Sequence, residues 1–90
     1  MAKSDKKTYP CRICGFDHGA PVRDEFGLPQ YDYCDACGAE VGVVDENPED
    51  VRAFRTRWIN RGSKWWSKYT SSPKDWNPQE QMKNIPPEWR

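Results

Sequence analysis

The clearest hydrophobic pattern in the chain has the period of an α-helix. Four apolar residues recur at helical spacing in its second half: Val51, Phe54, Trp58 and Ile59. The arginines among them are expected mostly on the other faces. Asn47 offers a side-chain cap, Pro48 suits the first helical position and Gly62 is a natural stop. The pattern therefore predicts a helix between Asn47 and Gly62.

A second helix start of the same design follows in the C-terminal part of the chain. Asn77 and Pro78 repeat the cap and the proline, and Glu80 at the third helical position predicts a capping box. This helix is expected to be short because Pro86-Pro87 ends it. An irregular aromatic and basic connection, SKWWSKYTSSPKDW, lies between the two helices.

The chain before Asn47 lacks a helical period and is rich in turn-forming residues. The segment PQYDYC alternates aromatic and polar residues, and AEVGVV offers Val41 and Val43 on one face, as a half-buried hairpin would. This pattern predicts a small β module. Residues 1–8 are polar and lysine-rich without periodicity, so we expect a disordered leader there.

A chain of 90 residues buries a limited fraction of its surface and often needs a disulfide or a bound metal to stabilise its fold. Its apolar bulk comes mainly from five Trp, four Tyr and three Phe residues. No run of about 18 apolar residues is present to span a bilayer, and the polar start is not followed by an apolar stretch of the secretory kind. The sequence predicts a cytoplasmic protein without a membrane segment.

Four cysteines can supply this stabilisation. Cys11 and Cys14 form one Cys-x2-Cys pair, and Cys34 and Cys37 form a second, which is the two-pair spacing of zinc sites. Four thiolates complete the tetrahedral shell that a structural zinc ion prefers. A glycine directly follows each pair, where a positive φ would turn backbone amides toward the thiolates. We expect one structural zinc ion bound by these four cysteines.

Other uses of the cysteines fit less well. Iron in a rubredoxin-like site is the closest alternative to zinc, because that site uses the same glycine-followed knuckles. A redox role needs one Cys-x2-Cys pair near a strand–helix junction rather than two matched pairs, and disulfides are rare in a reducing cytosol. His18 is expected to be a loop residue, because four thiolates are already available as ligands.

Together these elements predict a small α+β protein. Residues 9–90 are expected to form a single domain, with a zinc-ribbon or knuckle β module at 9–46 and a helical, Trp-rich part at 47–90 that holds one longer and one short helix. No enzyme constellation is present, since His18 is the only histidine and there is no glycine-rich phosphate loop. We therefore expect a binding protein rather than an enzyme.

Charge is distributed unevenly along the chain although the net charge is zero. Residues 11–50 hold ten acidic and two basic residues, whereas residues 51–90 hold three acidic and nine basic residues. The acidic half disfavours nucleic acid and favours a protein partner with a basic surface. The acidic candidates for contact with that partner are Asp32, Asp35 and Glu40.

The segment 52–69 keeps a nucleic-acid-binding zinc ribbon open as an alternative. Its bases are interleaved with Trp58, Trp65, Trp66 and Tyr69, and such aromatics can stack on single-stranded bases. Trp65 and Trp66 cannot both point inward from consecutive positions unless the chain turns sharply. We therefore expect one of these two tryptophans to contact a partner.

Four segments resemble one known group of proteins: YPCRICGF, YDYCDACGAEVGV, WINRGSKWWSKY and DWNPQEQMKNI. Over most of residues 9–85 they are similar to small bacterial cysteine-rich proteins of the CPCC type. Arg12 departs from that type, which has proline or another small residue after the first cysteine. Several such proteins look like immunity proteins of toxin systems. The resemblance implies an inhibitor that binds a toxin directly, and the acidic segment suits a toxin with a basic surface.

Overall fold

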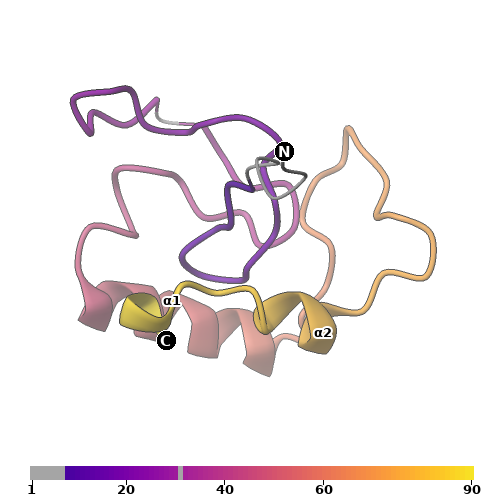
Figure 1. The fold of residues 1–90 in the computed structure, drawn as a ribbon. Helices are drawn as coiled ribbons and strands as arrows, with labels where there is room; N and C mark the ends of the chain where they lie inside the picture. The colour runs from indigo at the N-terminus through magenta and orange to yellow at the C-terminus, as the bar shows by residue number, and fades with distance from the viewer. Residues whose placement is uncertain (1–7, 31) are drawn as a thin grey trace, which may run out of the picture.

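The computed structural model describes residues 8–30 and 32–90 (Figure 1). It contains helix α1 (Pro48–Asn60), helix α2 (Pro78–Met82) and a short 3-10 helix, η2 (Pro87–Trp89). The predicted order of one longer helix, an irregular aromatic segment and one short helix is confirmed. The predicted disordered leader, residues 1–8, lies outside the described residues except for Thr8.

Helix α1 begins and ends as its flanking residues predict. The Asn47 side chain accepts a hydrogen bond from the amide of Asp50 at 2.9 Å, and Pro48 occupies the first helical position. At the other end Gly62 has a φ of 101°, and its amide donates to the carbonyl of Ile59 at 2.9 Å. Glycine adopts this left-handed conformation without steric cost, so the helix stops there.

Helix α2 has the same cap but not the full capping box. The Asn77 side chain accepts a hydrogen bond from the amide of Glu80 at 3.0 Å. The Glu80 carboxylate, which a capping box would turn back to Asn77, instead accepts a hydrogen bond from Lys83 Nζ at 3.0 Å. Only the forward half of the predicted capping box therefore forms.

One face of α1 packs against the loops that carry the cysteines. Val51 and Trp58 are buried and Phe54 is partly buried, as predicted. Ile59 also falls at helical spacing, but it is 43% exposed and lies outside the buried stripe. Ile59 directly follows Trp58, and one residue turns a helix by about 100°. That rotation carries the Ile59 side chain off the buried stripe.

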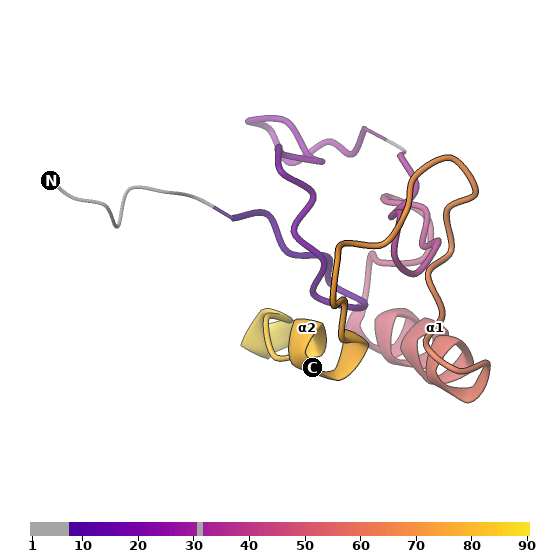
Figure 2. The ribbon, with the colours of Figure 1, turned by 90° about the vertical axis from the view of Figure 1, so that its right-hand side faces the viewer.

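The helices and the cysteine loops form two sides of the molecule. In Figures 1 and 2, α1, α2 and η2 lie together below the loops of the N-terminal half. Helix η2 contacts α1, and the Trp89 ring lies 4.1 Å from the guanidinium carbon of Arg12. The buried core cluster is formed by Cys11, Ile13, Cys14, Cys34, Ala36, Cys37, Ala39, Val51 and Trp58. No helix in the described ranges is long and apolar enough to cross a bilayer.

The predicted β module contains little β structure. Over the described residues before α1, pairing is limited to isolated antiparallel bridges. These bridges join Pro10 to Asp17, Arg23 to Pro29, and Tyr33 to Glu40. Val41 is buried whereas Val43 is exposed, so the prediction that they share one face is wrong. The amides of Val43 and Val44 both donate to the carbonyl of Glu40, which makes a turn rather than a strand with alternating faces.

Candidate metal centre

The two Cys-x2-Cys-Gly segments fold into matching knuckles, residues 11–16 and 34–39. In each knuckle the amide of the first cysteine donates to the carbonyl five residues later, and the amide of the glycine donates back to the carbonyl of that cysteine. The pairs are Cys11–Phe16 and Gly15–Cys11 in the first knuckle, and Cys34–Ala39 and Gly38–Cys34 in the second, at 2.8 to 2.9 Å. An antiparallel bridge closes the base of each knuckle. The sequence duplication is therefore a structural duplication.

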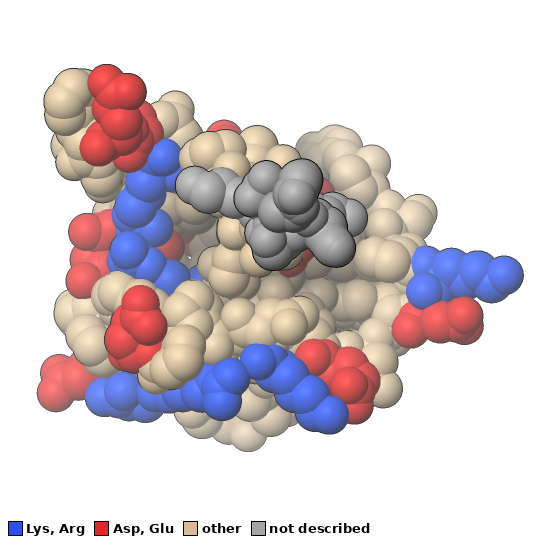
Figure 3. Space-filling view, in the orientation of Figure 1, with Lys and Arg blue, Asp and Glu red and all other residues tan. Residues whose placement is uncertain are grey.

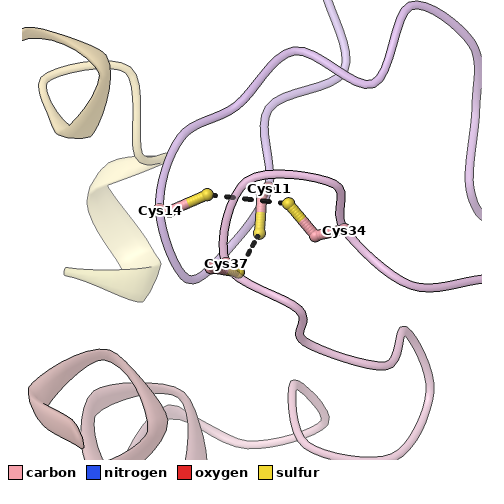
Figure 4. Close-up of side chains that lie close together, drawn as sticks. All are labelled: Cys11, Cys14, Cys34 and Cys37. Atoms are coloured by element: carbon pink, nitrogen blue, oxygen red, sulfur yellow. Dashed lines mark hydrogen bonds between the residues drawn. The ribbon is translucent and has the colours of Figure 1, made fainter. Parts of the chain in front are cut away.

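The knuckles bring four buried sulfur atoms into one cluster (Figure 4). All four Sγ atoms lie within 4.8 Å of one another. Cys11 and Cys37 are 3.8 Å apart at sulfur, and Cys14 and Cys34 are 3.7 Å apart. A tetrahedral zinc ion with bonds of about 2.3 Å separates its sulfurs by about 3.8 Å, whereas a disulfide needs about 2.05 Å. The separations fit a metal shell and not disulfide bonds.

Without a metal, the pKa values of three of the clustered cysteines shift in opposing directions. Hydrogen bonds from Cys14, then from Cys34 and Cys37, lower the pKa of the Cys11 thiol well below its usual value. The hydrogen bond to Cys11 raises the pKa of Cys14, and burial raises the pKa of Cys37. A bound cation resolves this conflict, because a thiol that coordinates a metal is deprotonated.

The two knuckle glycines have the predicted positive φ, and a backbone amide of the first knuckle reaches a sulfur atom. Gly15 and Gly38 have φ values of 84° and 81°, as expected. Their amides donate to the carbonyls of Cys11 and Cys34, so they do not turn toward a thiolate. The amide that does reach a sulfur is that of Ile13, which donates to Cys11 Sγ at 3.3 Å. The glycines shape the turns, and a neighbouring amide contacts the thiol.

The missing side chains of these glycines also make room for other segments. A methyl group at Gly15 would overlap the carbonyl oxygen of Gln81 in α2. The same helix contacts the first knuckle through the Gln81 side chain, which donates to the carbonyl of Cys14 at 3.2 Å. A methyl group at Gly38 would overlap the ring of Trp66. Each knuckle is therefore backed by a segment from the C-terminal half.

The cysteine cluster is placed to bind one metal ion. Its thiol ligands suit tetrahedral zinc and tetrahedral iron alike, and His18 is not among the clustered ligand atoms. Comparisons with protein-family models, with curated proteins and with solved structures found no match to this chain. The metal-binding role is therefore inferred from the geometry and chemistry of the four cysteines.

Arg55 of α1 ties the first knuckle to the C-terminal tail. Its Nε donates to the carbonyl of Ile13 at 2.6 Å, and one terminal nitrogen donates to the carbonyls of Arg12 and Trp89 at 2.9 and 2.6 Å. Burial lowers the pKa of Arg55, and the charge of nearby cysteines opposes that shift. The arginines of this helix are expected mostly on its other faces, and Arg55 is an exception. Its position four residues after Val51 falls within the buried stripe and is the signal that identifies it.

Replacement of Arg55 by methionine should lower the free energy of unfolding by roughly 2–3 kcal/mol, because it keeps the apolar stem and removes the donors from three carbonyls. Arg52→Met is the matched control. Arg52 is exposed and donates only to the carbonyl of Arg90, at 3.2 Å, so its loss should cost less than about 0.5 kcal/mol. Denaturant titration of both variants at the same metal concentration measures the difference. Equally small losses of unfolding free energy in the two variants would show that Arg55 does not link the first knuckle to the C-terminal tail.

The predicted acidic contact residues lie around the second knuckle. Asp32 is exposed, and Asp35 and Glu40 are half-buried. Their carboxylates form no hydrogen bond or ion pair with another described residue. The backbone of this region is fixed, since the carbonyl of Asp35 accepts hydrogen bonds from the amides of Trp66 and Ser67 at 3.2 and 2.9 Å. Among the described residues these carboxylates are unpaired, whereas the backbone at Asp35 is held by hydrogen bonds.

The two consecutive tryptophans point to different surroundings. Trp66 is 48% exposed and stacks on Tyr33, with ring centroids 5.5 Å apart and an interplanar angle of 12°. Trp65 is half-buried and packs edge-on against Phe16 and Trp76, at 5.4 and 5.3 Å. Trp66 is thus the exposed member of the pair. Partner contact by either residue remains a prediction.

Several members of the basic aromatic segment 52–69 are occupied in internal contacts. Arg55 binds backbone carbonyls, Trp58 is buried, and Trp65 packs against other rings. Tyr69 is 95% exposed and Trp66 partly so. Figure 3 shows a band of Lys and Arg side chains along the helical side of the molecule. Nucleic-acid stacking would therefore have fewer rings available than the sequence indicates.

Proposed function

We propose that the cysteine cluster holds one structural zinc ion and that residues 9–46 form a zinc-ribbon-like module. The matching knuckles and the sulfur separations of 3.7 and 3.8 Å support this proposal. The four thiolates fit both metals, and zinc is proposed over iron because a purely structural site needs no redox-active ion. A closed shell leaves no position for substrate, so the ion stabilises the fold and takes no part in catalysis.

We further propose that the protein is a non-enzymatic, cytoplasmic binding protein that neutralises a bacterial toxin by direct contact. The exposed stack of Tyr33 on Trp66 carries this proposal. Exposed aromatic rings on a fixed backbone are typical anchors of protein interfaces. The resemblance to CPCC-type proteins supports the inhibitory role, and the proposed metal would fix Cys34, which directly follows Tyr33.

The partner is expected to present a basic surface. Asp32 and Asp35 flank Tyr33 and Cys34 in sequence, and their carboxylates are not used within the described chain. Unpaired carboxylates at the rim of an interface mainly raise the association rate, whereas central aromatic rings slow dissociation. The acidic residues and the aromatic stack therefore have separable roles in binding.

The partner to test is the product of the neighbouring toxin-like gene. Reversal of Asp32, Asp35 and Glu40 to lysine should slow association about tenfold or more at low salt and reduce its salt dependence. Glu88→Lys, at an exposed acid outside this surface, should leave binding unchanged. Trp66→Ala should speed dissociation and cost about 2 kcal/mol or more, and Tyr69→Ala is its exposed control.

Stopped-flow binding at low and moderate salt measures these rates, with circular dichroism and metal content as checks on folding. No stable complex with the gene product would refute the toxin-binding proposal. Unchanged binding by the triple variant at both salt concentrations would show that the acidic residues are only solvated surface.

A further inference from the structure

Residues 23–29 form a projecting loop with a fixed shape, here called the acidic loop. Asp24 organises it: the amides of Phe26 and Leu28 both donate to Asp24 Oδ1 at 2.9 Å, and the Asp24 amide donates to the carbonyl of Leu28 at 2.9 Å. At its base, Arg23 donates to Asp45 Oδ1 at 3.1 Å and to Glu46 Oε2 at 2.9 Å. The loop is therefore held at its tip and at its base.

The acidic loop displays apolar side chains that its own fold does not use. Phe26 is 78% exposed and Leu28 is 60% exposed, and the neighbouring Glu25 is exposed as well. Figure 3 shows acidic side chains gathered on this projection. Single exposed apolar residues are ordinary, but two on one rigid, acidic tip form a preorganised contact. Such a contact loses little conformational entropy on binding.

A surface cleft of about 520 Å³ has the complementary properties. Its walls are aromatic, with Phe54, Trp58, Trp65 and Trp66, and we call it the aromatic cleft. The indole nitrogens of Trp58 and Trp65 already donate to the carbonyls of Lys64 and Thr70, at 2.9 Å each. Trp58 is buried, so the ring surface open to an occupant comes from Trp66, which is 48% exposed, and from the half-buried Phe54 and Trp65.

Two cations stand at the aromatic cleft without an acidic partner. Arg61 and Lys64 line it, and neither forms an ion pair within the described residues. The one hydrogen bond from the Arg61 side chain is a long one of 3.4 Å to the carbonyl of Arg57 in its own helix. The cleft therefore suits an occupant with an aromatic side chain and adjacent carboxylates.

We propose that the acidic loop of one copy of this protein docks into the aromatic cleft of a second copy. Phe26 enters among the rings, where edge-to-face contacts are favourable, and Glu25 approaches Arg61 and Lys64. The loop and the C-terminal end of α1 lie far apart in Figures 1 and 2. A loop therefore meets the cleft of another molecule rather than its own.

The proposed contact is small and its two sides differ. One loop in one cleft buries less than the about 1,000 Å² of a stable interface, so we expect a dissociation constant between about 10 µM and 1 mM. Each molecule in such a head-to-tail contact keeps one free loop or one free cleft, and association continues beyond a dimer unless a ring closes. The proposal does not depend on the toxin-binding function.

Sedimentation velocity over a concentration series tests the proposal. The weight-average mass of the wild-type protein should rise with concentration and fall again with added salt. Phe26→Ser and the double variant Arg61→Glu/Lys64→Glu should each weaken self-association at least about tenfold. The matched controls are Tyr69→Ser, at a more exposed ring, and Lys74→Glu, at an exposed cation outside the cleft. Both controls should associate like the wild type.

Mixing the two defective variants gives the decisive result. Phe26→Ser retains a working cleft and Arg61→Glu/Lys64→Glu retains a working loop, so an equimolar mixture should form a dimer and nothing larger. A wild-type protein that stays monomeric up to about 1 mM, or a mixture that does not associate, overturns the proposal. Self-association that survives Phe26→Ser would place the contact on another surface. Circular dichroism and metal content confirm that each variant is folded.

Discussion

Replacement of Cys34 by serine is expected to remove the metal and unfold both knuckles. Serine has a hydroxyl in place of the fourth thiolate, so only three sulfur ligands of the tetrahedral shell remain. Binding energy for a structural zinc ion is folding energy, with apparent values of about 10–16 kcal/mol in small domains. The four cysteines are also a large part of the buried core cluster. Losing the metal therefore removes the centre of the core.

Elemental analysis and circular dichroism measure this effect. The native protein should carry one equivalent of zinc per chain, and the Cys34→Ser variant close to none. Ala36→Ser is the matched control, because Ala36 is fully buried in the same knuckle but is not a ligand. Ala36→Ser introduces the same hydroxyl group into the knuckle, and this variant should retain the metal. Less than about half an equivalent of metal in fresh native protein would argue against the zinc centre, and iron in place of zinc would correct the choice of metal.

Replacement of Gly15 by alanine should destabilise the protein by about 3 kcal/mol or more. Two costs combine at this position. An alanine with a φ near 84° is strained by roughly 1–2 kcal/mol. Its methyl group also overlaps the carbonyl oxygen of Gln81, a backbone atom that moves only if α2 shifts. The contact between α2 and the first knuckle is therefore expected to open.

Gly19→Ala separates these two costs. Gly19 has a similar φ of 78°, but a methyl group there would meet no atom within 4 Å. It should cost only the strain, roughly 1–2 kcal/mol. Denaturant midpoints at equal zinc concentration compare the two variants, and hydrogen exchange of the α2 amides reports the opening. Equal losses in both variants would mean that the close approach of α2 contributes nothing.

The features that the sequence predicted well depend on local chemistry. Two cysteines must have a fixed spacing to bind the same metal, as in the pairs Cys11–Cys14 and Cys34–Cys37. The cluster could therefore be predicted from the positions of the four cysteines alone. Both helix starts follow from an asparagine cap and a proline, which act within one turn. Such signals need no knowledge of distant residues.

The features that the sequence left open depend on contacts between distant segments. Arg55 turns inward because three carbonyls from both ends of the chain accept its hydrogen bonds, the nearest of them 34 residues away. The choice between Trp65 and Trp66 depends on Trp76 and on two rings that are more distant in sequence, Phe16 and Tyr33. Local pattern alone does not contain this information.

Each knuckle contacts a different C-terminal segment. These contacts bear on the order in which the parts of the chain fold. Gln81 bonds to Cys14 across 67 residues, whereas Trp66 bonds to Ala36 across less than half that separation. Closing a flexible loop costs more entropy as the loop lengthens. When the proposed metal joins the knuckles and Trp66 has docked, both links shorten the loop that must close between the first knuckle and Gln81. The long loop between Cys14 and Gln81 would then close in several short steps. In that order of folding, the stretch between Trp66 and α2 becomes ordered last.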